Sequence, residues 1–207
     1  MIPVLGLIGA IGAGKSTVAR TFARRGGYPV DCDHLGHVAI GQPEILSKLV
    51  ERWGERILLA DGTPNRKVIG GIVFADAQER IFLERAAFPM IGKLARQEIA
   101  TANVNPTMRF VVLDAATLLE ANWGEFCDRI VYVDAAVELR RRRVFTRSGW
   151  EETELARREA AQWSAEVKKA RADVVIQNEG TEDDLQVVVD RLLKEWGWID
   201  EKECTDD

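Results

Sequence analysis

A glycine-rich segment near the N-terminus carries the strongest chemical pattern in the chain. Residues 9–16 read GAIGAGKS and fit the pattern G-x-x-x-x-G-K-[ST]. A continuous apolar run, 2–8, precedes the segment, and a helical pattern, 16–25, follows it. In such a loop the backbone N–H groups turn towards phosphate oxygens, and the positive end of the helix adds to the attraction. The alternative is a glycine-rich turn that holds no ligand, but a match in this context favours a phosphate cradle.

The side chains of this loop have distinct expected tasks. Lys15 would reach the β- and γ-phosphates of a nucleotide, and the hydroxyl of Ser16 would bind Mg²⁺. The residues expected to contact the nucleotide here are Gly9, Gly12, Ala13, Gly14, Lys15, Ser16 and Thr17. The motif indicates a nucleotide without defining the reaction. An Asn-Lys-x-Asp segment, which switch GTPases usually carry for guanine, does not occur in the sequence.

Two carboxylates follow the second apolar run of the chain. Asp31 and Asp33 flank Cys32 there. Because ligands of an open parallel sheet bind outside the carboxyl ends of its strands, at least one of these carboxylates should face the phosphate site. It would orient an acceptor hydroxyl and take its proton. Alternatively, Asp33 caps a helix that begins at His34.

A third carboxylate, Asp114, ends another apolar run. It is a candidate Mg²⁺ ligand in the manner of a Walker B aspartate, or else an ordinary residue of a strand-end turn. His34 and His37 lie three residues apart, but no third metal ligand accompanies them, so we expect both to be bystanders.

A run of four arginines suggests a second phosphate-binding element. Arg140, Arg143 and Arg147 lie on one face of a helix, at i, i+3 and i+7. Three guanidinium groups on one face can close over a polyphosphate and stabilise charge in the transition state. Arg142 faces elsewhere, with Glu138 four residues before it as a partner. Two alternatives stay open: a solvated basic face balanced by nearby glutamates, and a nucleic-acid patch.

The composition restricts the class of protein. The chain has 207 residues, a formal net charge of −5 and 46% hydrophobic residues, which excludes a disordered chain and disfavours nucleic acid or an anionic membrane as a partner. Its cysteines, Cys32, Cys127 and Cys204, are odd in number and far apart, which indicates a reducing cytosol rather than a disulfide framework or a zinc site. No run of 18 apolar residues occurs, so we expect no membrane span.

Short apolar runs alternate with helical patterns along most of the chain. This alternation predicts an α/β fold with a five-stranded, mainly parallel sheet. The expected strands are 2–8, 28–30, 109–114, 129–134 and 173–176. The long gap after the second strand carries helical patterns of its own, at 44–53, 66–74 and 76–100, and so predicts an inserted helical subdomain.

The resulting domain plan has four parts. Three segments form the nucleotide-binding core: 1–33, 108–136 and 172–200. The inserted helical subdomain, which would bind the acceptor, covers 34–107. A helical lid covers 137–171, and an acidic tail covers 201–207.

Taken in order, these residues resemble the dephospho-coenzyme A kinase family, from about Val4 to about Leu193. Beyond the phosphate loop, the matching positions are Asp31-Cys32-Asp33, Asp61-Gly62, Arg66, Phe74, Leu118-Leu119-Glu120, Arg143, Arg147, Gln162, Lys168, Ala172-Asp173, Ile176, Asn178 and Gly180.

The resemblance implies a P-loop kinase that uses ATP and Mg²⁺. It would transfer the γ-phosphoryl group to the ribose 3′-hydroxyl of dephospho-CoA, giving CoA and ADP. Asp33 would be the base, and Lys15, Arg143 and Arg147 would complete the catalytic set. The same resemblance implies dephospho-CoA contacts for Asp31, Asp33, Arg66 and Phe74, and nucleotide contacts for Arg140 and Asn178.

The chain departs from the family pattern at a few positions. Phe88 stands where the family commonly has histidine, and Ala116 falls in a segment where it commonly has proline. Arg140 replaces a glutamine, and Ser148 replaces an aspartate. Phe88 cannot supply the hydrogen bond of an imidazole, which leaves room for another hydroxyl acceptor. A nucleotide-dependent binding protein without transferase activity is the alternative outside the kinases.

Overall fold

The computed structural model describes residues 1–200 and divides the chain into two compact units. One unit comprises Met1–Asp31 and the chain from Glu98 onward, and the other comprises Cys32–Gln97. The sequence-based limits of the inserted part were 34 and 107, so the division in the structure falls a little earlier at both ends. The acidic tail, 201–207, lies outside the described residues.

The first unit is built on a five-stranded sheet, as predicted. Its strands are β1 (Val4–Gly9), β2 (Gly27–Asp31), β3 (Phe110–Asp114), β4 (Arg129–Asp134) and β5 (Val174–Gln177). The spatial order is β2-β3-β1-β4-β5, and every neighbouring pair is parallel. Asp114 is in register with Leu7 of β1 on one side and with Asp31 of β2 on the other. The carboxyl ends of these strands therefore meet at one edge of the sheet.

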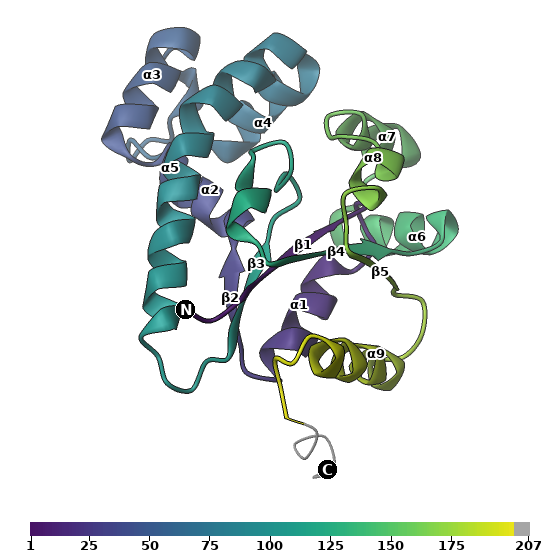
Figure 1. Ribbon diagram of the computed structural model, residues 1–207. Coiled ribbons are helices and arrows are strands. Elements are labelled where there is room, and N and C mark those ends of the chain that lie inside the picture. The colour runs from purple at the N-terminus through teal and green to yellow at the C-terminus, as the bar shows by residue number, and fades with distance from the viewer. Residues whose placement is uncertain (201–207) are drawn as a thin grey trace. The chain divides into compact units, whose positions relative to one another are not determined.

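Helices cover this sheet because its strands are apolar on both faces. Every residue of β1 is buried, as expected for a central strand of a parallel sheet. Figure 1 shows α1 (Lys15–Ala23) and α9 (Glu182–Glu195) beside each other on one side of the strands. Their buried side chains, which include Phe22 and Val189, share one core with Leu5 and Leu7.

The remaining helices of this unit follow β3 and β4. They are η2 (Trp123–Phe126), α6 (Val137–Ser148), α7 (Glu152–Glu159) and α8 (Ala165–Lys169), of which η2 is a short 3₁₀ helix. The charged stretch predicted as a lid thus consists of three helices. α6 ends at Gly149, whose φ of 66° lies in the left-handed region that glycine adopts without strain.

The second unit is helical, as predicted for the insertion. It contains α2 (Cys32–Ile40), α3 (Pro43–Trp53), the 3₁₀ helix η1 (Glu55–Ile57), α4 (Arg66–Ala75) and most of α5 (Ala77–Asn103). α2 begins at Cys32, so Asp33 lies in its first turn. The alternative interpretation, in which Asp33 caps a helix that begins at His34, is therefore wrong.

A buried tryptophan organises the second unit. Trp53 is 6% exposed and packs edge-on against Phe82, with ring centroids 5.7 Å apart. Its indole N–H donates to Glu79 at 2.7 Å, and Arg52 donates two hydrogen bonds to the same carboxylate. These donors hold the pKa of Glu79 at about 2, well below its usual 4.5.

Candidate active site

The phosphate loop joins β1 to α1 and depends on two glycines with positive φ. Gly12 has φ 80° and Gly14 has φ 88°, which L side chains rarely adopt. A Cβ at Gly12 would also lie 2.7 Å from the carbonyl oxygen of Arg140, and one at Gly14 would collide with the amide of Asn178. α1 has no acidic residue in its first turn, so the positive end of the helix stays available to an anion.

Two side chains from distant parts of the sequence hold the carbonyl of Ala13 in this loop. Asn178, only 7% exposed, follows β5 and donates to the oxygen at 2.8 Å. Arg143 of α6 donates to the same oxygen at 3.3 Å. Both residues were expected at the nucleotide, and the structure brings both to the loop that would bind it.

The loop lysine contacts the carboxylate at the end of β3. The ammonium group of Lys15 forms an ion pair with Asp114, and both side chains are largely buried, 15% and 14% exposed. Asp114 is thus more than a strand-end turn residue. Its register with Asp31 places that second carboxylate at the same edge of the sheet.

Two of the four consecutive arginines, Arg140 and Arg143, point towards the phosphate loop, and the other two point away from it. Arg140 donates to the carbonyl of Ile11 at 3.1 Å and forms an ion pair with Glu159 of α7. Its own Nε is buried without a partner among the described residues. Arg140 therefore joins α6 and α7 to the phosphate loop, as Arg143 does at Ala13. Arg147 is exposed near the end of α6.

The other two arginines of the run face away from the loop. Arg141 pairs with Glu152 at 3.0 Å, and Arg142 lines a cavity of the lid helices together with Phe145, Trp150 and Leu155. The run is therefore half a solvated face and half a support for the loop. The helical spacing had placed Arg140 and Arg143 on one face and Arg142 elsewhere, and the contacts of these three residues follow the same division.

The acceptor candidates of the second unit include one residue that the sequence interpretation set aside. Arg66, at the start of α4, is exposed and lies 2.7 Å from Nδ1 of His37 on α2. Because a guanidinium only donates, Nδ1 accepts and the proton of the neutral ring lies on Nε2. His37 thus orients Arg66 and is no bystander. Phe74 is half-buried on the same helix as Arg66, and Asp33 is exposed on α2.

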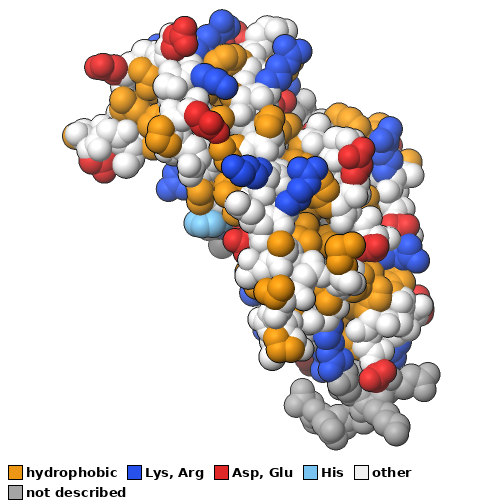
Figure 2. All heavy atoms as spheres, turned by 60° about the vertical axis from the view of Figure 1, so that its left-hand side comes forward, with side chains coloured by type: hydrophobic (Ala, Val, Ile, Leu, Met, Phe, Trp, Pro, Cys, Tyr) orange, Lys and Arg blue, Asp and Glu red, His pale blue; other side chains and the backbone are white. Residues whose placement is uncertain are grey.

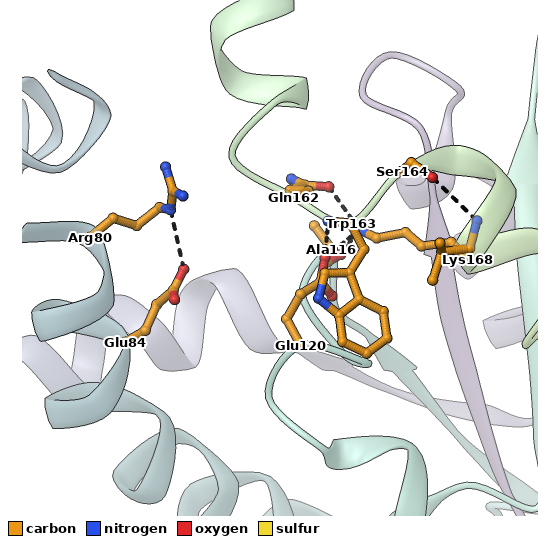
Figure 3. Close-up of polar contacts among 9 residues, drawn as sticks. Arg80, Glu84, Ala116, Glu120, Gln162, Trp163, Ser164 and Lys168 are labelled. Atoms are coloured by element: carbon orange, nitrogen blue, oxygen red, sulfur yellow. Dashed lines mark hydrogen bonds and ion pairs between the residues drawn. The ribbon is translucent and has the colours of Figure 1, made fainter. Parts of the chain in front are cut away.

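A buried polar cluster joins the end of the lid to the segment after β3 (Figure 3). The ammonium group of Lys168 is 2.7 Å from the carbonyl oxygen of Ala116 and 2.9 Å from both Glu120 and Gln162. Lys168 is 2% exposed. No pattern in the sequence indicates this burial, because charged residues on a short helix are normally solvated.

The pKa of Tyr132 on β4 lies well above its ordinary value. Burial and the nearby Asp134 carboxylate raise the pKa of Tyr132 to about 12. Its hydroxyl has no partner among the described residues, and Lys169 lies 5.4 Å from its ring. The phenol stays neutral at physiological pH, so we do not assign it an acid–base role.

Within residues 1–200 no group of three or more His, Cys, Asp or Glu side chains is arranged to hold a metal ion alone. None of the helices within residues 1–200 is long and apolar enough to cross a membrane.

The charges on the surface are of both signs. On the face shown in Figure 2, basic and acidic side chains are mixed.

Comparison with known proteins decides the family. The model of the dephospho-CoA kinase family matches residues 3–184. The chain belongs to the dephospho-CoA kinase family. A dephospho-CoA kinase of Enterococcus faecalis is 35% identical over 198 residues, 94% of this chain and 98% of that protein. One of Shouchella clausii is 38% identical over 195 residues, 92% of this chain and 97% of that protein.

Solved structures share this fold. Protein TT1252 of Thermus thermophilus shares 30% identity and a TM-score of 0.77, covering 94% of this chain and 98% of that one. The dephospho-CoA kinase of Campylobacter jejuni has a TM-score of 0.58 at 20% identity, covering 93% and 96%. A shikimate kinase of Acinetobacter baumannii reaches 0.54 at 19% identity, covering 94% of both chains. The last two show the fold alone, which is that of a P-loop kinase.

Proposed function

We propose that this member of the dephospho-CoA kinase family transfers the γ-phosphoryl group of ATP to the ribose 3′-hydroxyl of dephospho-CoA, giving CoA and ADP. The family match supports this reaction, and the phosphate loop is the structural observation that supports phosphoryl transfer. Its lysine meets the carboxylate of Asp114, and its carbonyls are held by residues of the lid and of the segment after β5. This is a prepared site for a polyphosphate in a chain of that family.

The phosphate loop and the arginines of α6 have different parts in the proposed reaction. The backbone N–H groups and the start of α1 bind the phosphates, and Lys15 exchanges Asp114 for the phosphate oxygens. Arg143 and Arg147 stabilise the charge that develops on the transferring group. Because the carbonyl of Ala13 holds Arg143 beside the loop before ATP binds, this group needs little reorganisation in the transition state.

Oxygen ligands for Mg²⁺ are present beside the loop. Ser16 is exposed as the second residue of α1, and Asp114 supplies a carboxylate. This donor set fits Mg²⁺, which prefers oxygen and takes few protein ligands. Ser16 and Asp114 would hold the ion, which would supply positive charge to offset the charge of the phosphates.

The acceptor side is assigned to residues that follow β2 or lie on α4. Asp31 ends β2 at the edge where Asp114 lies, and Asp33 follows it by two residues. We assign Asp33 as the base that orients the 3′-hydroxyl and takes its proton. Arg66 and Phe74 would contact dephospho-CoA, with Arg66 oriented by His37.

The test is ADP release with purified protein, ATP and Mg²⁺. Dephospho-CoA should support turnover, whereas adenosine and nucleoside monophosphates should support little. Turnover with another hydroxyl acceptor but not with dephospho-CoA would assign a different kinase activity, in line with Phe88 and Ala116. Tight ATP binding without transfer to any of them would indicate a binding protein.

A further inference from the structure

The side chain of Lys168 on α8 is a buried charge with a full set of hydrogen-bond acceptors. Its three ammonium hydrogens meet three acceptors, which are the carbonyl oxygen of Ala116 at 2.7 Å and side-chain oxygens of Gln162 and Glu120, both at 2.9 Å. An ammonium group has three donors and no more, so this geometry uses its full capacity. Figure 3 shows these side chains converging on the ammonium group.

Glu120 completes the cluster from the segment that follows β3. Its Oε1 accepts from Lys168 and, at 2.9 Å, from the backbone N–H of Trp163. Its Oε2 is buried without a partner in residues 1–200, and the side chain is 11% exposed. Removing the Lys168 charge would leave this carboxylate buried and uncompensated.

The cluster joins two segments that the proposed reaction needs in fixed positions. Ala116 lies two residues after Asp114, which contacts Lys15. Gln162 and Trp163 lie where α7 has ended and the chain turns towards α8, at the C-terminal end of the predicted lid. The other end of the lid is held at the phosphate loop by Arg140 and Arg143. Both ends are therefore attached to segments of the phosphate site.

We propose that Lys168 is a positioning residue, which fixes the C-terminal end of the lid to the segment after Asp114 and so sets where the lid arginines meet ATP. This inference rests on the proposed kinase function. Lys168 does not touch the substrate; it acts through Glu120, Gln162 and the carbonyl of Ala116.

A purely stabilising role is a poor explanation of the buried ion pair between Lys168 and Glu120. A buried ion pair is often no more stabilising than apolar side chains of the same size, because both charges lose their hydration. α8 already has a second connection to the sheet, since Lys169 pairs with Asp134 at 2.5 Å at the end of β4. What the buried cluster adds is a directional attachment with three defined acceptors.

The test compares Lys168→Met with Lys194→Met. Methionine keeps an unbranched apolar stem of similar length and removes the charge, and Lys194 is an exposed lysine on α9. We expect Lys168→Met to lower kcat/KM for ATP by tenfold or more, with KM for dephospho-CoA changed less than twofold. Lys194→Met should match the wild type. Wild-type kcat/KM for ATP in folded Lys168→Met would overturn the proposal, even if its Tm fell.

A second variant keeps the test decisive if the first fails to fold. Lys168→Met combined with Glu120→Leu leaves no buried charge, so the same loss of kcat/KM in this variant supports positioning. Full activity in the double variant would assign the pair to folding alone and overturn the proposal.

Hydrogen exchange separates this inference from the proposed function. Peptides that cover 160–171 should exchange at least tenfold faster in Lys168→Met than in the wild type, with or without ATP. This readout needs no phosphoryl transfer, so it tests the attachment even if dephospho-CoA proves not to be the acceptor. Unchanged exchange there would overturn the attachment, whereas an inactive wild type would overturn only the proposed reaction.

Discussion

Replacing Asp33 with asparagine separates a catalytic carboxylate from one that only supports its helix. Asparagine has nearly the same shape and still accepts hydrogen bonds, but it cannot take up the proton of the acceptor hydroxyl as a carboxylate does. The proposed base role predicts a large loss of kcat for Asp33→Asn. A helix-supporting role predicts almost none.

The structure sets the size of the two effects. Asp33 is exposed and is the second residue of α2, where a negative charge interacts favourably with the helix dipole. Such an exposed charge contributes roughly 0.3–1 kcal/mol, so Asp33→Asn should cost at most about 1 kcal/mol of stability. Loss of a positioned base should lower kcat by roughly 10²–10⁴-fold. The lower end applies if the transition state is loose, because proton removal is then late.

The chain offers a matched control in Glu44. It is also exposed and is also the second residue of its helix, α3. Glu44→Gln removes the same kind of charge from the same helical position, and should lower Tm as much as Asp33→Asn while leaving kcat unchanged. Asp31→Asn is a second comparison and should cost less activity than Asp33→Asn.

Melting temperature and single-turnover phosphorylation of dephospho-CoA decide the matter. Full activity in Asp33→Asn would refute the base assignment. A larger loss in Asp31→Asn would move the role to the carboxylate that ends β2.

Three further predictions follow from the described contacts. Lys15→Ala should lower kcat about 10³-fold, the scale of a lost electrostatic phosphate contact, and near-wild-type single-turnover rates would contradict the loop assignment. Arg143→Ala should lower kcat/KM for ATP at least tenfold in steady-state assays, since its side chain reaches the loop, whereas Arg142→Ala should stay within twofold. The pKa of Glu79 is about 2 when folded and near 4.5 when unfolded, so its stabilising effect is complete above pH 4.5 and is lost as the pH falls towards 2. Thermal melts of Glu79→Gln between pH 7 and 3 should therefore show a shallower fall in Tm with acid than the wild type, and an equal fall would contradict that account.

The phosphate loop and the sheet were predictable because each rests on a local pattern. Short apolar runs bounded by turn residues are typical of buried strands, and Gly12 and Gly14 stand where the backbone needs positive φ. The loop motif also fixes its own context, a strand before and a helix after. These features need no knowledge of distant contacts.

The contacts that complete the site depend on distance in space, and the sequence could not supply them. Lys168 and Glu120 are 48 positions apart, and their burial follows from packing that no periodic pattern reports. The contact of His37 with Arg66 likewise joins two helices through the fold of the second unit. The start of α2 at Cys32 was missed because Asp33 is a good capping residue, and local preference was a poor guide there.

Three side chains donate hydrogen bonds to carbonyl oxygens of the phosphate loop. Each of these bonds also orients the N–H group on the other side of the same peptide. A trans peptide is planar, so its C=O and the next N–H point in opposite directions. Asn178 and Arg143 hold the carbonyl of Ala13, which directs the N–H of Gly14 away from them, and Arg140 at Ile11 does the same for Gly12. These three side chains thus affect phosphate binding without needing to touch the phosphate. Because the lid supplies two of them, a change in the position of α6 is also a change in the donors of the loop.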